Sequence, residues 1–223
     1  VLRLRKSSGG FDVTTDKSQY SAASVVVATG YFDNPARFEV PGADLPKVIR
    51  YYDEPYAYEG RNVAVVGGRN SAVEAALDLF RNGANVTLIH RGPTLSEGVK
   101  YWILPDIENR IRAGEIRGLF ETRVREIRSQ SILLAGKHEI EIPNDFVFVM
   151  IGYRPDTTIL EDIGVEINRD TLGPVYNPET METNVKGLYV AGSVAAGKYN
   201  NKIFIENGRT HGPVIIKEIM RVR

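Results

Sequence analysis

The stretch VAVVGGRNSAVEAALDLFRNGANVTLI, residues 63–89, decides the fold expected for this chain. It opens on an apolar run typical of a buried strand, and Val86–Ile89 form a second such run. Between the two runs, apolar residues recur at the spacing of one helix face: Val73, Ala76, Leu77 and Phe80. Asn82-Gly83 is a typical helix end. A strand, a helix and a second strand within about 30 residues predict a parallel βαβ unit.

A glycine-rich turn joins the first strand to the helix. Two adjacent glycines let the backbone approach a ligand closely, and the helix N-terminus presents N–H groups to a pyrophosphate. The usual G-x-G-x-x-G/A spacing is imperfect, because Arg69 stands at the second fixed glycine, although Ala72 keeps the final small residue. The residues expected at this dinucleotide site are Gly67, Gly68, Arg69, Asn70 and Ser71. An ordinary βα turn of another α/β fold is the alternative.

The residues after the second strand distinguish the two pyridine dinucleotides. NAD sites place Asp or Glu there for the ribose 2′-hydroxyl, whereas NADP sites use cationic groups for the 2′-phosphate. Here the strand is followed by His90 and Arg91, without an acid. Because the planar guanidinium of Arg91 can bind a phosphate, we expect NADPH as the ligand. The alternatives are a solvated loop charge for Arg91 and a structural role for His90.

Three further apolar runs, residues 24–30, 146–152 and 188–192, predict buried strands. Two of them end in small residues, at Thr29-Gly30 and at Gly192, which suits a backbone passing close under a flat cofactor. A plain strand followed by a turn would have the same spacing. The other expected elements are a meander opening the chain, a linker or crossover from Pro35 to Pro55 that is not part of the core, a helix from Pro105 to Gly114, antiparallel strands within residues 116–142 and a last helix from about residue 201 to residue 220.

Composition excludes several classes of function. The chain has 223 residues with 28 Lys plus Arg against 28 Asp plus Glu, so no basic surplus points to nucleic acid or an anionic membrane. It has no cysteine, which excludes disulfides, thiolate metal sites and thiol catalysis by these residues. His90, His138 and His211 are too scattered to suggest a metal site. With neither a signal peptide nor a run long enough to span a bilayer, a cytoplasmic protein is expected.

Several segments together resemble the two-dinucleotide flavoprotein superfamily that includes thioredoxin reductase. The matching pieces are residues 26–30, 40–42, 65–68, 88–91, 152–155 and 187–192, in the family's order. Residues 67–77, 102–105 and 203–209 are similar to the bacillithiol disulfide reductase branch. That branch would account for Arg69 and for the absence of the Cys-x-x-Cys that thioredoxin reductase carries in its NADPH domain.

The resemblance implies an α/β fold: a Rossmann-like three-layer NADPH-binding domain plus the C-terminal part of an FAD-binding domain. The implied ranges are 1–34 and 156–223 for FAD-domain segments and 35–155 for the NADPH-binding domain with its linkers. Hydride would pass from NADPH to FAD and on to a low-molecular-weight disulfide or another electron acceptor. The family's first FAD segment, with its G-x-G-x-x-G turn, would precede Val1, and in this branch it would include the reactive cysteine.

The resemblance also assigns flavin contacts, residue by residue, while no catalytic residue is expected within the chain. These contacts are Thr29, Gly30, Gly192, Ser193, Lys202 and Ile203, and Gly152 is expected to be a cofactor-binding residue without assignment to either dinucleotide. The family's final Ala-Gly-Asp reads Ala191-Gly192-Ser193 here, which weakens one contact. The last helix is expected to begin at residues 201–203 and to point its N–H groups toward the flavin pyrimidine. A homo-oligomer is compatible with the sequence, and a flavin-dependent monooxygenase and a non-catalytic NADP(H)-binding module are the alternatives.

Overall fold

The computed structural model describes residues 1–222, except for the side chains of residues 200 and 201. The chain divides into two compact units, which we call the inserted unit, Ala36–Gly152, and the terminal unit, Val1–Pro35 with Tyr153–Arg223. Among the described residues, no helix has the length and apolar character needed to cross a bilayer.

The two passages of the chain between the units are paired by backbone hydrogen bonds. In the inserted unit, the Ala36 N–H donates to the Gly152 carbonyl at 2.9 Å. In the terminal unit, the Arg154 N–H donates to the Asn34 carbonyl at 2.9 Å. The inserted unit therefore begins and ends at adjacent backbone positions.

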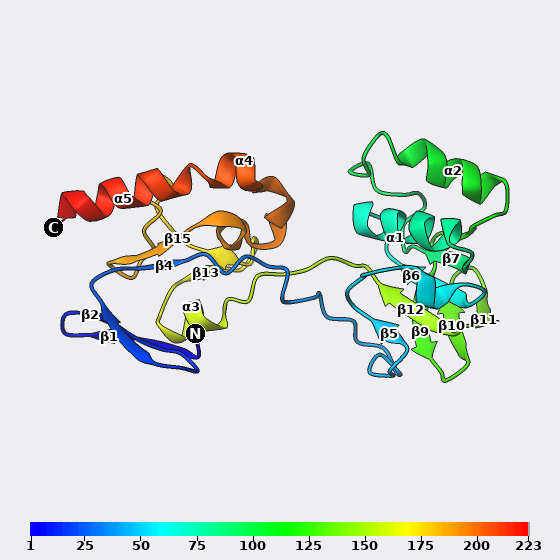
Figure 1. Ribbon diagram of the computed structural model, residues 1–223, viewed down its shortest axis with the longest axis horizontal. Coiled ribbons are helices and arrows are strands. Elements are labelled where there is room, and N and C mark those ends of the chain that lie inside the picture. Colours follow the sequence, from blue (N-terminus) through cyan, green and yellow to red (C-terminus); the bar gives the residue numbers. More distant parts are fainter. Residues whose placement is uncertain (223) are drawn as a thin grey trace. The chain divides into compact units, whose positions relative to one another are not determined.

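A parallel sheet of five strands forms the centre of the inserted unit (Figure 1). Its strands, in spatial order, are β5 (Val48–Ile49), β12 (Phe146–Val149), β6 (Asn62–Val66), β7 (Asn85–Ile89) and β8 (Arg117–Leu119). The connections include η1 (Tyr56–Tyr58), α1 (Asn70–Arg81) and α2 (Leu104–Arg112). A second, antiparallel sheet contains β9 (Arg123–Ile127), β10 (Ser131–Ala135) and β11 (Glu139–Pro143).

Alternating side chains of the parallel sheet join two separate cores. Val63 and Val65 of β6 pack with the apolar residues of α1 and α2. Ala64 and Val66 pack instead with residues of the antiparallel sheet, such as Ile132. Because successive residues of a strand point to opposite faces, an all-apolar strand needs a cover on both sides. The unit thus has the expected three layers: helices, parallel sheet and antiparallel sheet (Figure 1).

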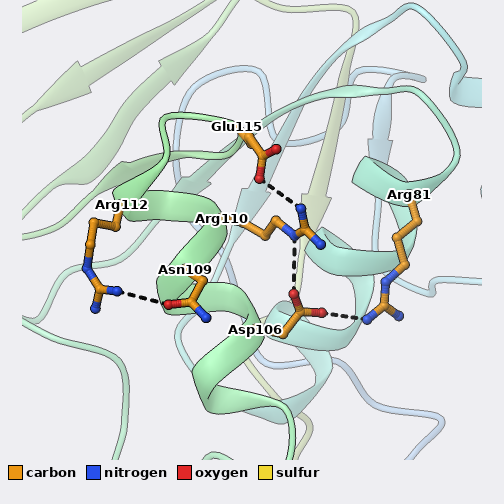
Figure 2. A network of polar contacts seen from close by, with 6 residues as sticks. All are labelled: Arg81, Asp106, Asn109, Arg110, Arg112 and Glu115. Carbon is orange, nitrogen blue, oxygen red and sulfur yellow. Dashed lines mark hydrogen bonds and ion pairs between the residues drawn. The ribbon is translucent and has the colours of Figure 1, made fainter.

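Charged side chains join the two helices of the first layer (Figure 2). Asp106, in the first turn of α2, pairs with Arg81 of α1 at 2.6 Å and with Arg110 at 3.2 Å. Arg110 also pairs with Glu115 at 2.9 Å, and its guanidinium lies 5.3 Å from the centre of the Phe80 ring. These exposed contacts orient α2, whereas Ile107, fully buried in the core, anchors it.

The terminal unit contains several short sheets. Its elements are β1 (Arg3–Ser7), β2 (Gly10–Thr14), β3 (Gln19–Ala22), β4 (Val25–Val27), α3 (Thr158–Asp162), β13 (Ile167–Asn168), β14 (Gly173–Pro174), β15 (Leu188–Val190), η2 (Gly192–Lys202), α4 (Ile205–Gly208) and α5 (His211–Val222). The first three form the expected antiparallel meander, and β4 pairs in parallel with β15. Leu4, Phe11, Leu160, Tyr189 and Ile215 belong to one core.

Two expectations about the inserted unit are corrected. The segment Pro35–Pro55, expected to be a linker, contributes β5, which pairs in parallel with β12 and completes one edge of the sheet. The segment 116–142 is not entirely antiparallel, because β8 pairs in parallel with β7. The reason lies in α2, a crossover helix that returns the chain to the same sheet in the same direction.

The run 24–30 is not the buried strand that its composition predicts. Only Val25–Val27 form β4, and the Val26 side chain is 43% exposed. Among the described residues β4 pairs only with β15, and no described element covers its outer face. Apolar composition shows that a strand can be buried on both faces, but it does not supply the covering element.

The last helix is broken, contrary to expectation. Residues 192–202 form η2, and α4 and α5 are separated at Arg209 and Thr210. Pro213 explains the break, because in a continuous helix its ring would crowd the carbonyl of Arg209 and it has no N–H to donate there. In the observed structure Pro213 lies in the first turn of α5, where no such donor is needed.

Tyr52 provides a test of the segment that was expected to be a linker. Its hydroxyl donates to Asp78 of α1 at 2.6 Å, and its ring meets Phe148 edge to face. We expect Tyr52→Phe to lower the free energy of unfolding by about 1 to 2 kcal/mol, since a bond to a charged acceptor is lost. Urea unfolding followed by circular dichroism measures this. Tyr56→Phe is the control, because Tyr56 is 75% exposed, and equal effects would contradict an anchoring role for Tyr52.

Candidate functional site

The turn between β6 and α1 lies at the carboxyl edge of the parallel sheet. Gly67 has φ +154°, and a Cβ there would overlap the Met150 carbonyl oxygen and the Ala72 side chain. A Cβ on Gly68 would overlap the ring of His90. The sequence explains these glycines by approach to a ligand, whereas in the structure each is already required by contact with protein atoms. The two explanations are compatible, because the helix starts immediately beyond the turn.

The N-terminus of α1 has no side-chain cap. Arg69 occupies the N-cap position, with extended backbone angles, and a guanidinium has no acceptor for the first helical N–H groups. The first turn of this 12-residue helix carries no acidic side chain. The helix therefore begins with a positive end and outward N–H groups, which favour an anion.

Asn70 holds the loop that connects β7 to α2. Its Nδ2 donates to the Gly98 carbonyl at 3.1 Å, and its Oδ1 accepts from the Lys100 N–H at 2.8 Å. Lys100 in turn pairs with Glu74 of α1 at 2.6 Å. Both ends of the Asn70 amide are thus engaged within the protein. Its assignment to cofactor binding stays a prediction, and the contacts seen here fix the loop beside the helix start.

His90 packs between two glycines. A Cβ on either Gly68 or Gly92 would overlap its ring. Its backbone N–H donates to the Leu119 carbonyl at 2.9 Å, and its carbonyl accepts from the Thr122 N–H at 3.0 Å. Burial, and secondly the charge of Arg91, lower the pKa of His90. The imidazole is therefore neutral at pH 7, and it contributes packing at this edge rather than positive charge.

The remaining polar residues of the turn face solvent. Arg69, Ser71 and Arg91 are exposed. Within residues 1–222, neither Arg69 nor Arg91 has a carboxylate within 4.0 Å. Two unpaired guanidiniums therefore belong to the uncapped helix start and to the end of the neighbouring strand. Gly152, with φ +94° and open space beside its Cα, follows β12 at the same edge of the sheet.

A second group of expected residues lies in the terminal unit, at the carboxyl ends of β4 and β15. The register pairs Val27 with Val190, so Thr29-Gly30 and Gly192-Ser193 leave the two strands at the same edge. Gly30 and Gly192 have φ +72° and +69°, conformations that favour glycine. A Cβ on Gly30 would have the Ser193 Oγ at 3.8 Å as its nearest neighbour, and one on Gly192 would have none within 4 Å.

Lys202 and Ile203 do not begin a helix, contrary to expectation. Lys202 ends η2, and α4 begins at Ile205, after the N-cap residue Phe204. The physical reason is the Asn207 side chain, whose Oδ1 accepts from the Phe204 N–H at 2.7 Å and thereby starts the helix later. Ile203 nevertheless lies close to Gly192, because a Cβ on Gly208 of α4 would have both Ile203 and Gly192 within 4 Å. The flavin contacts of these residues stay predictions.

Sequence reasoning missed His211 and Asn207. His211 accepts a hydrogen bond from the Gly192 N–H through Nδ1 at 3.1 Å, and Asn207 donates to the Lys202 carbonyl at 2.7 Å. Neither residue belongs to a spacing that predicts a site. For His211, the only indication in the sequence is its position directly before Gly-Pro at a helix start. For Asn207, the only indication is its position within the stretch 203–209.

The parallel sheet with its glycine-rich turn defines an α/β protein with a Rossmann-like unit. Residues 1–192 match the family described as pyridine nucleotide-disulphide oxidoreductase. The chain belongs to this family of oxidoreductases, which confirms the family and the fold class expected from the sequence.

Individual relatives are consistent with this assignment. The bacilliredoxin reductase Bdr of Bacillus subtilis is 48% identical over 213 residues, which cover 95% of this chain and 66% of the relative. A solved structure of bacillithiol disulfide reductase Bdr from Staphylococcus aureus is 39% identical, with a TM-score of 0.96 over 100% of this chain and 70% of that one. A thioredoxin reductase from T. acidophilum, 24% identical with a TM-score of 0.82 over 98% of this chain and 73% of that one, shares the fold. The chain spans about two thirds of the length of these relatives.

Asn70→Ala tests the attachment of the loop. Because two hydrogen bonds are lost, we expect the Lys100 amide to exchange at least about tenfold faster with solvent deuterium, equivalent to about 1.4 kcal/mol of opening free energy. Hydrogen exchange read by NMR measures it. Ser71→Ala, an exposed neighbour in the same helix turn, is the control. An unchanged Lys100 amide in the Asn70 variant would show that other contacts hold the loop.

Proposed function

We propose that the inserted unit binds NADPH at the turn 67–72. The observation that carries this proposal is the uncapped start of α1 together with Arg69 and Arg91, neither of which has a carboxylate within 4.0 Å among the described residues. A pyrophosphate fits such a helix end, because its oxygens accept the outward N–H groups and its charge opposes the positive helix end. Gly67, Gly68, Asn70, Ser71 and His90 build the surroundings of this anion site.

The preference for NADPH over NADH rests on Arg91. The end of β7 offers no carboxylate to a ribose 2′-hydroxyl, and Arg91 can make charge-assisted hydrogen bonds to a 2′-phosphate. Because His90 is neutral, the positive charge that attracts the 2′-phosphate would come from Arg91. Arg69 is the N-cap residue of α1, and we therefore assign it to the pyrophosphate rather than to the 2′-phosphate.

We further propose that the terminal unit contributes to an FAD site through Thr29, Gly30, Gly192 and Ser193. Two glycines with positive φ stand where two parallel strands end, and neither has a neighbour that fills the place of a side chain. A glycine backbone with open space beside its Cα suits the close approach of a flat group or a phosphate. Lys202 and Ile203 are included because of the resemblance to the family. On the same ground we propose Gly152, the last residue of the inserted unit, as a cofactor contact without assigning it to either dinucleotide.

The reaction we propose is NADPH-dependent reduction of a disulfide. NADPH and FAD, when bound, supply the hydride donor and its acceptor. The residues of this chain bind and orient: the start of α1 and Arg91 hold phosphates, and the glycines of the terminal unit leave space for the flavin. Because the chain has no cysteine, the thiolate that attacks a disulfide would come from outside these 223 residues.

The acceptor we propose is a low-molecular-weight disulfide. Support comes from similarity to a protein named bacillithiol disulfide reductase, while the name of the Bacillus subtilis relative points to bacilliredoxin, a second candidate acceptor. We propose the cytoplasm as the compartment, because NADPH and a thiol pool are both available there.

Replacement of Arg91 tests the dinucleotide preference. In the protein encoded by the full reading frame, we expect Arg91→Ala to weaken NADPH binding by roughly 10- to 100-fold and to leave NADH nearly unchanged, because only NADPH carries the 2′-phosphate. Fluorescence titration measures both affinities. Arg117→Ala is the matched control, since Arg117 is also exposed but begins β8 and pairs with Thr87 in the middle of β7, rather than lying beyond the carboxyl end of that strand. Equal losses for both dinucleotides would assign Arg91 a structural role.

The 223-residue chain alone tests which of the proposed functions its own residues support. We expect a colourless protein that binds NADP⁺ and does not oxidise NADPH when a low-molecular-weight disulfide is added, because it lacks both the flavin pyrophosphate turn and a thiolate. The product of the full reading frame should be yellow and should oxidise NADPH with bacillithiol disulfide. A yellow 223-residue chain with stoichiometric FAD would contradict the proposal, as would a full-frame product that never binds flavin.

A further inference from the structure

The segment Gly192–Lys202 connects β15 to α4 and carries three of the proposed flavin contacts. It is a distorted 3₁₀ segment, and Gly197 and Tyr199 inside it have non-helical backbone angles. A regular hydrogen-bond ladder therefore does not fix its shape from within. Two side chains from α4 and α5 hold its two ends instead.

Asn207 of α4 holds the later end. Its Oδ1 accepts from the Phe204 N–H and its Nδ2 donates to the Lys202 carbonyl, both at 2.7 Å. The Thr210 hydroxyl donates to the Asn207 carbonyl at 2.7 Å, and Gly208 packs against Ile203. The place where the segment ends is thus tied to α4.

His211, the first residue of α5, holds the earlier end. Its Nδ1 accepts from the Gly192 N–H at 3.1 Å. Because Nδ1 accepts, the neutral ring carries its proton on Nε2. The helix behind His211 is anchored by Ile215, which is 2% exposed. The imidazole therefore connects a fixed helix to the peptide group at which the chain turns away from β15.

Gly192 needs this support because of its position. It has φ +69°, and no atom lies within 4 Å of where its Cβ would be, so side-chain packing does not restrain it. Gly212, beside His211, has equally open surroundings. A glycine with open space on its side-chain face retains wide backbone freedom, and one directional hydrogen bond selects the orientation of its peptide plane.

We propose that His211 is a positioning residue for the flavin site, which acts by fixing the Gly192 amide and with it the turn Ala191-Gly192-Ser193. This proposal rests on the proposed function. The family's aspartate at position 193 is a serine here, so the turn contacts the cofactor through backbone and a hydroxyl, whose usefulness depends on the orientation of the turn. His211 supplies that orientation from 19 residues away.

The test uses the protein encoded by the full reading frame, with FAD removed and added back. His211→Leu deletes the acceptor, and we expect the FAD dissociation constant to rise by about 10- to 100-fold, with a shifted visible spectrum of the flavin that remains bound. His211→Asn places an amide oxygen near the position of Nδ1, and His211→Gln places it near that of Nε2. We expect the Asn variant to stay within about threefold of wild type and the Gln variant to behave like Leu.

Two controls separate positioning from loss of fold. NADP⁺ affinity reports on the inserted unit and should be unchanged in all variants. His138→Leu alters an exposed histidine in the turn between β10 and β11 and should leave FAD binding unchanged. If His211→Leu fails to fold, the contrast between Asn and Gln remains as the measure.

Two results would overturn the proposal: wild-type FAD affinity in the Leu or Gln variants, or an Asn variant no better than Gln. Failure of the wild-type protein to bind FAD at all is a different result, because it contradicts the proposed function and removes the basis of this inference with it.

Discussion

At Gly67, three elements meet without room for a side chain. The end of β6, the first turn of α1 and the carbonyl of Met150 beyond β12 converge there, and any Cβ would overlap one of them. This close approach lets α1 start directly after the strand and bury Ala72, Val73 and Ala76 against the sheet. The same approach leaves the positive end of the helix at the carboxyl edge, so packing and anion binding have a common origin.

The parts of the fold that the sequence predicts well are those determined by near neighbours. The βαβ unit of residues 63–89 is closed by short-range contacts and by the C-cap of its helix at Asn82, so its boundaries follow from periodicity and from Gly83. The positions of β5 and β8 do not, because two or three residues carry too little pattern and their pairing is decided by strands far along the chain. The exposure of Val26 depends on whether another element covers it, which composition does not encode. The break before α5 was readable from Pro213, because a proline at that position is incompatible with one continuous helix.

The candidate site likewise contains residues that the sequence predicts and residues that only the structure reveals. Gly67 through Ser71, His90 and Arg91 follow from a local motif, and the structure gathers them at one edge of one sheet. The use of the Asn70 amide could not be foreseen, because its partners Gly98 and Lys100 lie 28 and 30 residues away. His211 is one of three scattered histidines, and nothing in the sequence shows that its ring meets Gly192. Motifs identify residues that act through their own backbone, whereas residues that hold other residues in place become visible only when distant segments are brought together.

The paired passages between the units have a consequence for the origin of this architecture. Since the Ala36 N–H donates to the Gly152 carbonyl, the first and last residues of the inserted unit are adjacent. A segment with adjoining ends can be gained by, or excised from, a host protein without stretching the host's chain. The inserted unit thus has the geometry of an exchangeable module, which could be replaced as a whole without a change in the fold of the terminal unit.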